Sequence, residues 1–291
     1  MAKIELIRDP HFAGDIALLG PRHGDGVYAV WQGVDSKADA AWSVAQWGLY
    51  RNTLQADTPR EEVPGGYRCG NAAADITVCA DGEYDIRLAL RGSVEYEHAR
   101  RSNELWPHLL LGQNVTEGQA LSFDELSALR FRCRFRLEQC VDCMAPGEYT
   151  PSLHGVQVHQ FFTVGKPGSG DFMWFGIPFF EQREPGLYPG YACIDGAGGE
   201  IEGFSGKLIR TCPQAWFTDR SAHSGEWLEY DIDLLPCLRE AYDLAQSRGL
   251  LKGTAWSDLR ITSTNIGYEL FGTFDCAVQL GDMYLTAVTA E

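Results

Sequence analysis

The 291-residue chain is short of positive charge: 24 Lys and Arg stand against 40 Asp and Glu, and the formal net charge is −16. Such a chain repels a nucleic acid or an anionic membrane surface at long range, so neither is expected as a partner. A run of ~18 apolar residues is also missing, which argues against a transmembrane helix. Hydrophobic residues still make up 45% of the chain, too many for a disordered protein.

Targeting and cofactor signals are equally scarce. Met1–Glu5 lacks the apolar core of a secretory signal, so we expect a cytoplasmic protein, or a mature secreted one with an added start Met. No Walker-type phosphate loop, GxGxxG after a strand, HExxH or GxSxG elbow is found. We therefore predict no cofactor and no metal. The acidic segment 195–200 offers oxygen ligands without EF-hand spacing and is interpreted as a turn.

The nine cysteines are odd in number and scattered, unlike the framework of a small disulfide-rich scaffold. Several lie in apolar, strand-like contexts, so we expect buried free thiols. Cys140 and Cys143 form a lone CxxC pair without a second pair or suitably spaced histidines. A zinc site is not expected there, and a local disulfide stays open.

Short alternating segments that end in Gly, Pro, Asn or Asp recur along the chain, and no repeat or linker marks a boundary. Residues 1–291 are therefore predicted to form one all-β domain, a mostly antiparallel β-sandwich of jelly-roll type. The predicted strands are Val27–Gln32, Val44–Tyr50, Tyr84–Leu90, Leu105–Gln113, Arg130–Gln139, Val156–Val164, Phe172–Phe180, Lys207–Arg210, Trp227–Asp233, Leu259–Leu270 and Thr273–Val288.

Two segments have a clear face. Between Arg130 and Leu137, arginine alternates with Phe, Cys or Leu, which predicts a solvated cationic face and a core face. Leu234–Arg248 is the one convincing helix, because Leu235, Leu238, Tyr242 and Ala245 follow helical spacing. Asp233 is the expected N-cap, Pro236 fits the first turn and Gly249 the end.

The remaining signals are acidic side chains, histidines and aromatics on strands, a combination suited to carbohydrate. In the segment 261–272, alternation puts Ser263, Asn265, Gly267, Glu269 and Phe271 on one face. A Glu beside an Asn, a Gly and an aromatic is typical of an acid that lines a groove. An exposed strand Glu is the alternative.

An amphipathic helix, a short linker and a strand reading Asn-Ile-Gly-Tyr-Glu, followed by Phe271-Gly272, resemble the late part of concanavalin A-like endoglucanases. The similarity covers about residues 228–280. It implies a bent sandwich over one helix and a glycoside hydrolase with Glu269 as general acid/base. The nucleophile of that clan is a Glu before a Met-x-Trp-like strand, and its nearest equivalent here is Asp171. Glu181 is a rival carboxylate, which Arg183 could hold ionised.

A second constellation involves histidine. Gln157, His159 and Phe161 share one strand face, and Trp106 and His108 project together upstream. The segments 101–105 and 157–159 resemble sandwich-fold alginate-type lyases, in which Arg101 and Gln157 would neutralise a uronate and His159 would take a proton. Trp106 and Trp174 are expected to stack on sugar, whereas Trp31, Trp47 and Trp227 are expected in the core. The histidines in loop-like contexts carry no signal: His11, His23, His98, His154 and His223.

Three hypotheses follow. The first is a glycoside hydrolase for a neutral glycan, with Glu269 and Asp171 or Glu181 as catalytic carboxylates in a concave-sheet groove. The second is a non-catalytic lectin-like module, and the third is a lyase that uses His159 and Arg101. The acidic charge favours a neutral glycan over a uronate polymer. The expected ligand-binding residues are Trp106, His108, Gln157, His159, Phe161, Trp174 and Asn265.

Overall fold

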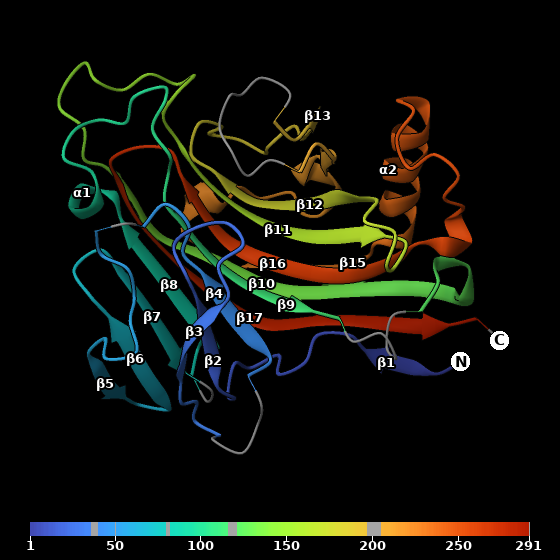
Figure 1. The fold of residues 1–291 in the computed structure, drawn as a ribbon, viewed down its shortest axis with the longest axis horizontal. Helices are drawn as coiled ribbons and strands as arrows, with labels where there is room; N and C mark the ends of the chain where they lie inside the picture. The colour runs from blue at the N-terminus through green and yellow to red at the C-terminus, as the bar shows by residue number, and fades with distance from the viewer. Residues whose placement is uncertain (36–39, 50, 80–81, 116–120, 197–204, 291) are drawn as a thin grey trace.

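The computed structural model describes residues 1–35, 40–49, 51–79, 82–115, 121–196 and 205–290. Its strands form two stacked sheets (Figure 1). The eight-stranded sheet has the order β15-β10-β17-β8-β7-β6-β5, with β1 paired to β17. Its strands are β1 Lys3–Glu5, β5 Arg60–Val63, β6 Gly66–Gly70, β7 Ala74–Cys79, β8 Ile86–Arg91, β10 Leu126–Asp142, β15 Leu228–Asp233 and β17 Phe274–Thr289.

The nine-stranded sheet has the order β13-β14-β12-β11-β16-β9-β4-β2-β3. It comprises β2 Ile16–Leu19, β3 Val27–Trp31, β4 Trp42–Ala45, β9 His108–Asn114, β11 Val156–Gly165, β12 Phe172–Glu181, β13 Tyr191–Ile194, β14 Leu208–Thr211 and β16 Arg260–Leu270. Its strands pair antiparallel except β2 with β4 and β12 with β14. The prediction of an all-β, mostly antiparallel sandwich of jelly-roll type is confirmed.

Aromatic side chains fill the space between the sheets. Phe131 of β10 meets Phe162 of β11 edge-on at 5.6 Å between ring centroids. Phe135, four residues further along β10, stacks on Phe179 of β12 with ring centroids 5.0 Å apart. Because Phe162 faces this core, the alternate β11 residues Gln157, His159 and Phe161 face away from it. This outward face of the nine-stranded sheet carries the site.

The late helix is present as α2, Leu235–Ser247, after β15 (Figure 1). The N-cap position is Leu234, not Asp233 as predicted, although the Asp233 carboxylate accepts a hydrogen bond from the Leu235 N–H at 3.1 Å. Gly249 has a φ of 73° just beyond the end. The buried stripe is Leu238, Ala241 and Ala245, so Ala241 takes the place expected for Leu235 and Tyr242, which are only half-buried. The short helices are α1 Gly92–Glu95 and the 3₁₀ turns Phe123–Glu125, Gln214–Trp216, Ala222–Ser224 and Trp256–Asp258.

All eleven predicted strands overlap a strand of the structure, but Val44–Tyr50 shrinks to β4, Trp42–Ala45, and position 50 lies outside the described residues. The strands β1, β2, β5, β6, β7 and β13 were not predicted. Most are three to five residues long, so they offer too few positions for an alternating pattern to emerge. Most of segment 195–200, interpreted as a turn, also lies outside the described residues.

The arginine row of β10 is the solvated face that the sequence predicts. Arg130 and Arg134 form ion pairs with Asp231 and Asp282, while Phe131 and Phe135 are fully buried. The Arg134 guanidinium also lies 4.6 Å from the centroid of the Trp227 ring. Trp227 therefore belongs to this outer face, and its assignment to the core was wrong.

Cys69, Cys133, Cys140, Cys143, Cys193, Cys212, Cys237 and Cys276 are free thiols. Cys69, Cys133, Cys212 and Cys276 are buried as expected, but Cys143 is exposed. Cys140 and Cys143 do not pair with each other; Cys140 lies opposite Cys276 in the β10–β17 ladder. Among the described residues, no helix is both long enough and apolar enough to cross a bilayer.

Candidate functional site

Strand pairing assembles a polar row across four neighbouring strands. Glu269 of β16 lies opposite His108 of β9 on one side and opposite Gln157 of β11 on the other. Gln157 in turn lies opposite Glu181 of β12. In antiparallel sheets, directly opposite residues project to the same face. The row therefore gathers residues more than 150 positions apart in the sequence onto the outward face of the sheet.

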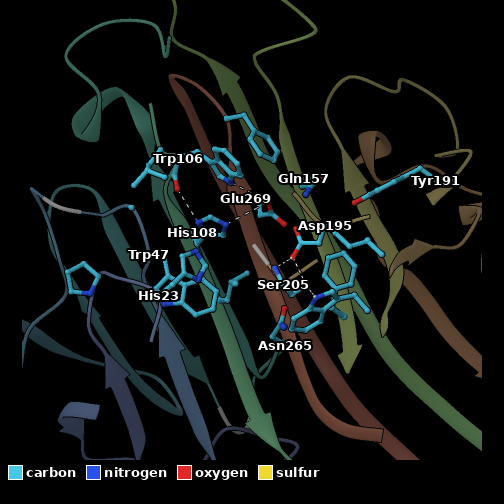
Figure 2. Close-up of a pocket in the computed structure, with 18 of the residues that line it drawn as sticks. His23, Trp47, Trp106, His108, Gln157, Tyr191, Asp195, Ser205, Asn265 and Glu269 are labelled. Carbon is cyan, nitrogen blue, oxygen red and sulfur yellow. Dashed lines mark hydrogen bonds and ion pairs between the residues drawn. The ribbon is translucent and has the colours of Figure 1, made fainter. Parts of the chain in front are cut away.

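A pocket of about 500 Å³ opens above this row. Its walls are rich in aromatic side chains from strands and loops. The lining residues are Pro21, His23, Trp47, Gly48, Leu105, Trp106, His108, Leu110, Gln157, Phe161, Trp174, Arg183, Tyr188, Tyr191, Asp195, Ser205, Ile209, Asn265, Glu269 and Phe271. Figure 2 shows Glu269 in the middle of this pocket, between His108 and Gln157. The size and the few convergent polar groups fit a small-molecule or cofactor site.

Glu269 is held as a carboxylate. Its Oε2 accepts a hydrogen bond from the Trp106 indole N–H at 3.2 Å and lies 3.7 Å from His108 Nε2. Burial alone would raise the pKa of Glu269, but hydrogen bonds from His108 and Gln157 and the nearby histidines outweigh it and lower the pKa to about 2. Glu269 is therefore ionised at neutral pH, although only a quarter of its side chain is exposed.

His108 is oriented by a backbone group. Its Nδ1 lies 3.0 Å from the Trp106 carbonyl oxygen, an acceptor, so Nδ1 carries a proton. This leaves Nε2 pointing at Glu269, as the dashed lines of Figure 2 trace. The carbonyl of Trp106 fixes the ring that positions Glu269.

The pocket lining contains a second carboxylate, Asp195, which follows β13. Its Oδ2 accepts hydrogen bonds from the Ser205 N–H at 2.8 Å and the Ser205 hydroxyl at 2.7 Å (Figure 2). Ser205 in turn accepts one from the Trp174 indole at 3.1 Å. This chain fixes the orientation of Asp195 towards the pocket.

Both carboxylates of the pocket influence the pKa of His23. Its ring packs against that of Trp47 in a tilted arrangement, with centroids 4.1 Å apart and planes at 32°. Burial and His108 lower the pKa of His23, while Asp195 and, to a smaller degree, Glu269 raise it. Both carboxylates therefore lie within electrostatic range of the same imidazole. Among the described residues, Asp195 and Glu269 are the two acidic side chains that line the pocket.

Most of the predicted ligand-binding residues come together. Glu269, Trp106, His108, Gln157, Phe161, Trp174 and Asn265 all line the pocket. His159 faces the same side of β11 but is only 2% exposed and lies behind the lining.

The two predicted partner carboxylates do not join Glu269. Asp171 precedes β12, whose first residue, Phe172, lies opposite Gly165, whereas Glu181 at the other end lies opposite Gln157. Ten residues at ~3.3 Å each put Asp171 roughly 33 Å along the strand from the Glu269 row. There it pairs with Lys207 at 3.1 Å. Glu181 lies in the row, but it is buried behind the pocket and held by Arg183 at 2.6 Å. The structure thus argues against Asp171 as the second catalytic carboxylate.

The lyase constellation is also incomplete. Arg101 is exposed, its N–H binds the Glu104 carboxylate, and it does not line the pocket. Arg183 lines the pocket instead, but two of its nitrogens bind Glu181, so its charge is already compensated. The structure therefore leaves His159 without the uncompensated arginine that a uronate carboxylate needs.

Several lining residues carry no signal in the sequence that marks them as part of a site. His23 and Asp195 come from loops, and Trp47, expected in the core, is half-exposed to the pocket. No spacing rule links positions 23, 47, 195 and 269, because only the folded chain brings them together. Within the described ranges, no group of three or more His, Cys, Asp or Glu side chains is arranged to hold a metal ion.

Comparison with known proteins finds similarity to solved structures but none in sequence. No protein-family model matches it, and no curated protein matches its sequence. Solved structures similar to it include a family 12 xyloglucanase from Bacillus licheniformis, with 10% identity over 85% of this chain and 100% of that one, at a TM-score of 0.47. An endoglucanase from Rhodothermus marinus has 11% identity over 80% and 97%, at 0.41. A family 11 xylanase from Neocallimastix patriciarum has 7% identity over 84% and 100%, at 0.43. At these values the similarities carry no inference about activity, which has to come from the chain's own side chains.

Proposed function

We propose that this protein is a glycoside hydrolase that binds an uncharged glycan in the aromatic pocket and attacks it with Glu269. The observation that carries this proposal is the ionised Glu269 carboxylate at the floor of a pocket walled by Trp47, Trp106 and Trp174. Aromatic faces stack on the apolar faces of sugar rings, and carboxylates act on acetals. Both parts of that chemistry converge in one cavity.

The low pKa assigns Glu269 a different role from the general acid/base that the family resemblance implies. A general acid has to carry a proton in the complex with its substrate, and a carboxyl group with a strongly lowered pKa does not. With a pKa of about 2, Glu269 is instead suited to attack the anomeric carbon or to stabilise a developing oxocarbenium ion. His108 and Trp106 fix its orientation for that step.

Asp195 is the counterpart that we propose as proton donor to the leaving group. It lines the same pocket as Glu269, and its orientation is fixed through Ser205. In a retaining mechanism Glu269 forms a glycosyl ester while Asp195 protonates the departing oxygen. Asp195 then deprotonates the water that hydrolyses the ester, and the starting protonation state is restored.

The test compares the wild-type protein with Glu269→Gln and, as a matched control, Glu229→Gln, an exposed glutamate of β15. A panel of 4-nitrophenyl glycosides and neutral β-glucans and xylans supplies the substrates. We expect hydrolysis by the wild type and the control and none by Glu269→Gln, which should still bind the sugar. Full turnover by Glu269→Gln would refute the proposal, and sugar binding without any turnover by the wild type would identify a lectin-like module.

The role of Asp195 has its own test. Dinitrophenolate leaves without protonation, whereas the oxygen of a natural sugar needs a proton donor. Asp195→Asn should therefore lose turnover of an oligosaccharide by about 100-fold or more while turnover of a dinitrophenyl glycoside changes much less. An equal loss on both substrates would assign Asp195 to binding instead.

A further inference from the structure

His159 combines deep burial with unsatisfied polar atoms. The residue is 2% exposed, and among the described residues neither Nδ1 nor Nε2 has a hydrogen-bond partner. A buried polar group without a partner costs about 1–3 kcal/mol. Two such atoms on one side chain, beside a pocket, indicate a place where a ligand completes the hydrogen bonding.

The neighbours of His159 explain why the strand ladder does not satisfy it. Across the sheet it lies opposite Gly267 on β16 and Pro178 on β12, which offer no polar side chain. Gly267 also has a φ of 151°, and a Cβ there would lie 2.0 Å from the Leu109 carbonyl oxygen, so no larger residue can take its place.

On the pocket side, His159 is separated from the cavity by two rings. Phe161 lies 5.6 Å and Tyr188 5.7 Å from it, centroid to centroid, and both line the pocket. Gln157, two residues earlier on the same face, lines the pocket directly beside Glu269 (Figure 2). The Tyr188 side chain comes from the connection between β12 and β13, whereas Phe161 belongs to β11 itself.

The charge state of His159 defines what it can bind. Burial lowers its pKa to about 4, and the charged groups that face it, Glu181 and Glu269 on one hand and Arg183 on the other, do not reverse this. At neutral pH the imidazole is therefore uncharged and offers one N–H donor and one lone-pair acceptor. A hydroxyl group, which both donates and accepts, matches that pair, whereas a carboxylate would only accept.

We propose that His159 and Gln157 form a subsite that binds hydroxyl groups of an uncharged sugar ring positioned over Glu269, with Tyr188 turning aside on binding. This inference rests on the proposed function, since it presumes a carbohydrate in the pocket, and it names the substrate class. Gln157 already donates to Glu269, so its amide oxygen is the group left for a ligand. A uronic acid at the same place would put its carboxylate beside Glu269 with a neutral histidine for a partner, which disfavours it.

The experiment uses Glu269→Gln, which does not consume the ligand, and four neutral probes: cellobiose, xylobiose, laminaribiose and mannobiose. Calorimetry measures their affinity in this background and after the further change His159→Phe or His159→Asn. We expect a loss of at least about 10-fold for His159→Phe and a smaller loss for His159→Asn, which keeps a donor and an acceptor. Equal affinity of Glu269→Gln with and without His159→Phe would overturn the subsite.

Monodeoxy versions of the tightest probe sharpen the test. Removal of the hydroxyl that His159 binds should weaken binding to Glu269→Gln and leave the affinity of the His159→Phe double variant unchanged, a non-additivity that a merely structural histidine does not produce. Nitrogen NMR of the imidazole should show the Nδ1 and Nε2 resonances move on saturation, and unmoved resonances would contradict the proposal. If no probe binds Glu269→Gln at all, the proposed function itself fails, which is a different outcome.

Discussion

Two histidines five residues apart are equally buried but differ in their hydrogen bonding. His154 and His159 are each 2% exposed. His154 has both ring nitrogens occupied: Nδ1 accepts from the Thr150 N–H at 2.9 Å, and Nε2 lies 2.9 Å from the Arg100 carbonyl oxygen. His159 has neither nitrogen occupied among the described residues. His154 thus connects two loops by hydrogen bonds, whereas His159 packs against the rings that line the pocket.

Two carboxylates repeat the contrast. Asp75 on β7, with no exposed surface, contacts Arg68, Arg87 and Arg91 at 2.6 to 3.1 Å. Burial raises the pKa of Asp75, but these arginines lower it overall. The pKa of Glu269 is lowered as well, yet its contacts are one indole, one imidazole and an amide, and part of the carboxylate faces a cavity.

The difference separates structural from functional burial. Outside the pocket, the paired groups have their hydrogen bonds supplied by the fold. At the pocket, the fold holds polar groups in place and leaves part of their bonding capacity open. An incompletely satisfied buried group weakens the fold unless a ligand completes its hydrogen bonding.

Among the substitutions that test this difference, the largest expected effect is the loss of catalysis in Glu269→Gln. Glu269→Gln should lower kcat/KM by at least about 10³-fold, because it removes the ionised nucleophile. The midpoint of urea unfolding should also fall, because the lowered pKa of Glu269 means that the folded protein stabilises its ionised form. Activity is therefore compared per folded molecule, and unchanged activity per folded molecule would place Glu269 with the structural carboxylates.

Asp75→Asn should show the reverse. Removing the partner of three arginines costs about 3–5 kcal/mol in the free energy of unfolding. Activity per folded molecule should remain unchanged. Urea unfolding and active-site titration measure the two quantities, and a loss of activity without a loss of stability would contradict the assignment.

The stability of the protein at mild acid should depend on His159. Its pKa is about 4 in the folded protein against 6.5 for an ordinary histidine. The unfolded chain therefore takes up the proton first as the pH falls, and the free energy of unfolding should decrease by about 3 kcal/mol between pH 6.5 and 4. His159→Phe should remove this part of the pH dependence, and an unchanged slope would mean that His159 is not neutral in the fold.

The smallest expected effect is on stability at neutral pH. His154→Phe leaves the Thr150 N–H and the Arg100 carbonyl without partners and should cost about 2–3 kcal/mol. His159→Phe breaks no hydrogen bond and removes two buried nitrogens without partners, so it should leave stability unchanged or raise it. Thermal unfolding of the two variants measures the difference, and equal losses would erase the contrast between the two histidines.

The parts predicted from the sequence are those with a local signal. Alternation placed Gln157, His159 and Phe161 on one face of β11, and the same rule aligned Asn265 with Glu269 on β16. The pairing of whole strands has no local signal. Asp171 was selected for its place before Met173, but the register of β11 with β12 puts Glu181, not Asp171, at the end where Glu269 lies.

The loop residues of the pocket were also not predicted from the sequence. Asp195 and His23 reach the pocket from opposite parts of the chain, and their neighbours in sequence are glycine-rich turns without periodicity. Their role depends on the distance to Glu269 and on partners such as Ser205, both of which exist only after folding.

The most direct test of the central claim is covalent trapping. A 2-deoxy-2-fluoro glycoside with a dinitrophenolate leaving group, made from the best substrate of the panel, reacts with a nucleophilic carboxylate to give a long-lived glycosyl ester. We expect the intact mass of the wild-type protein to increase by one fluorosugar, with the adduct on the peptide that contains Glu269 and no labelling of Glu269→Gln. An adduct on another residue, or hydrolysis of the parent glycoside without any adduct, would contradict the assignment of Glu269 as the nucleophile.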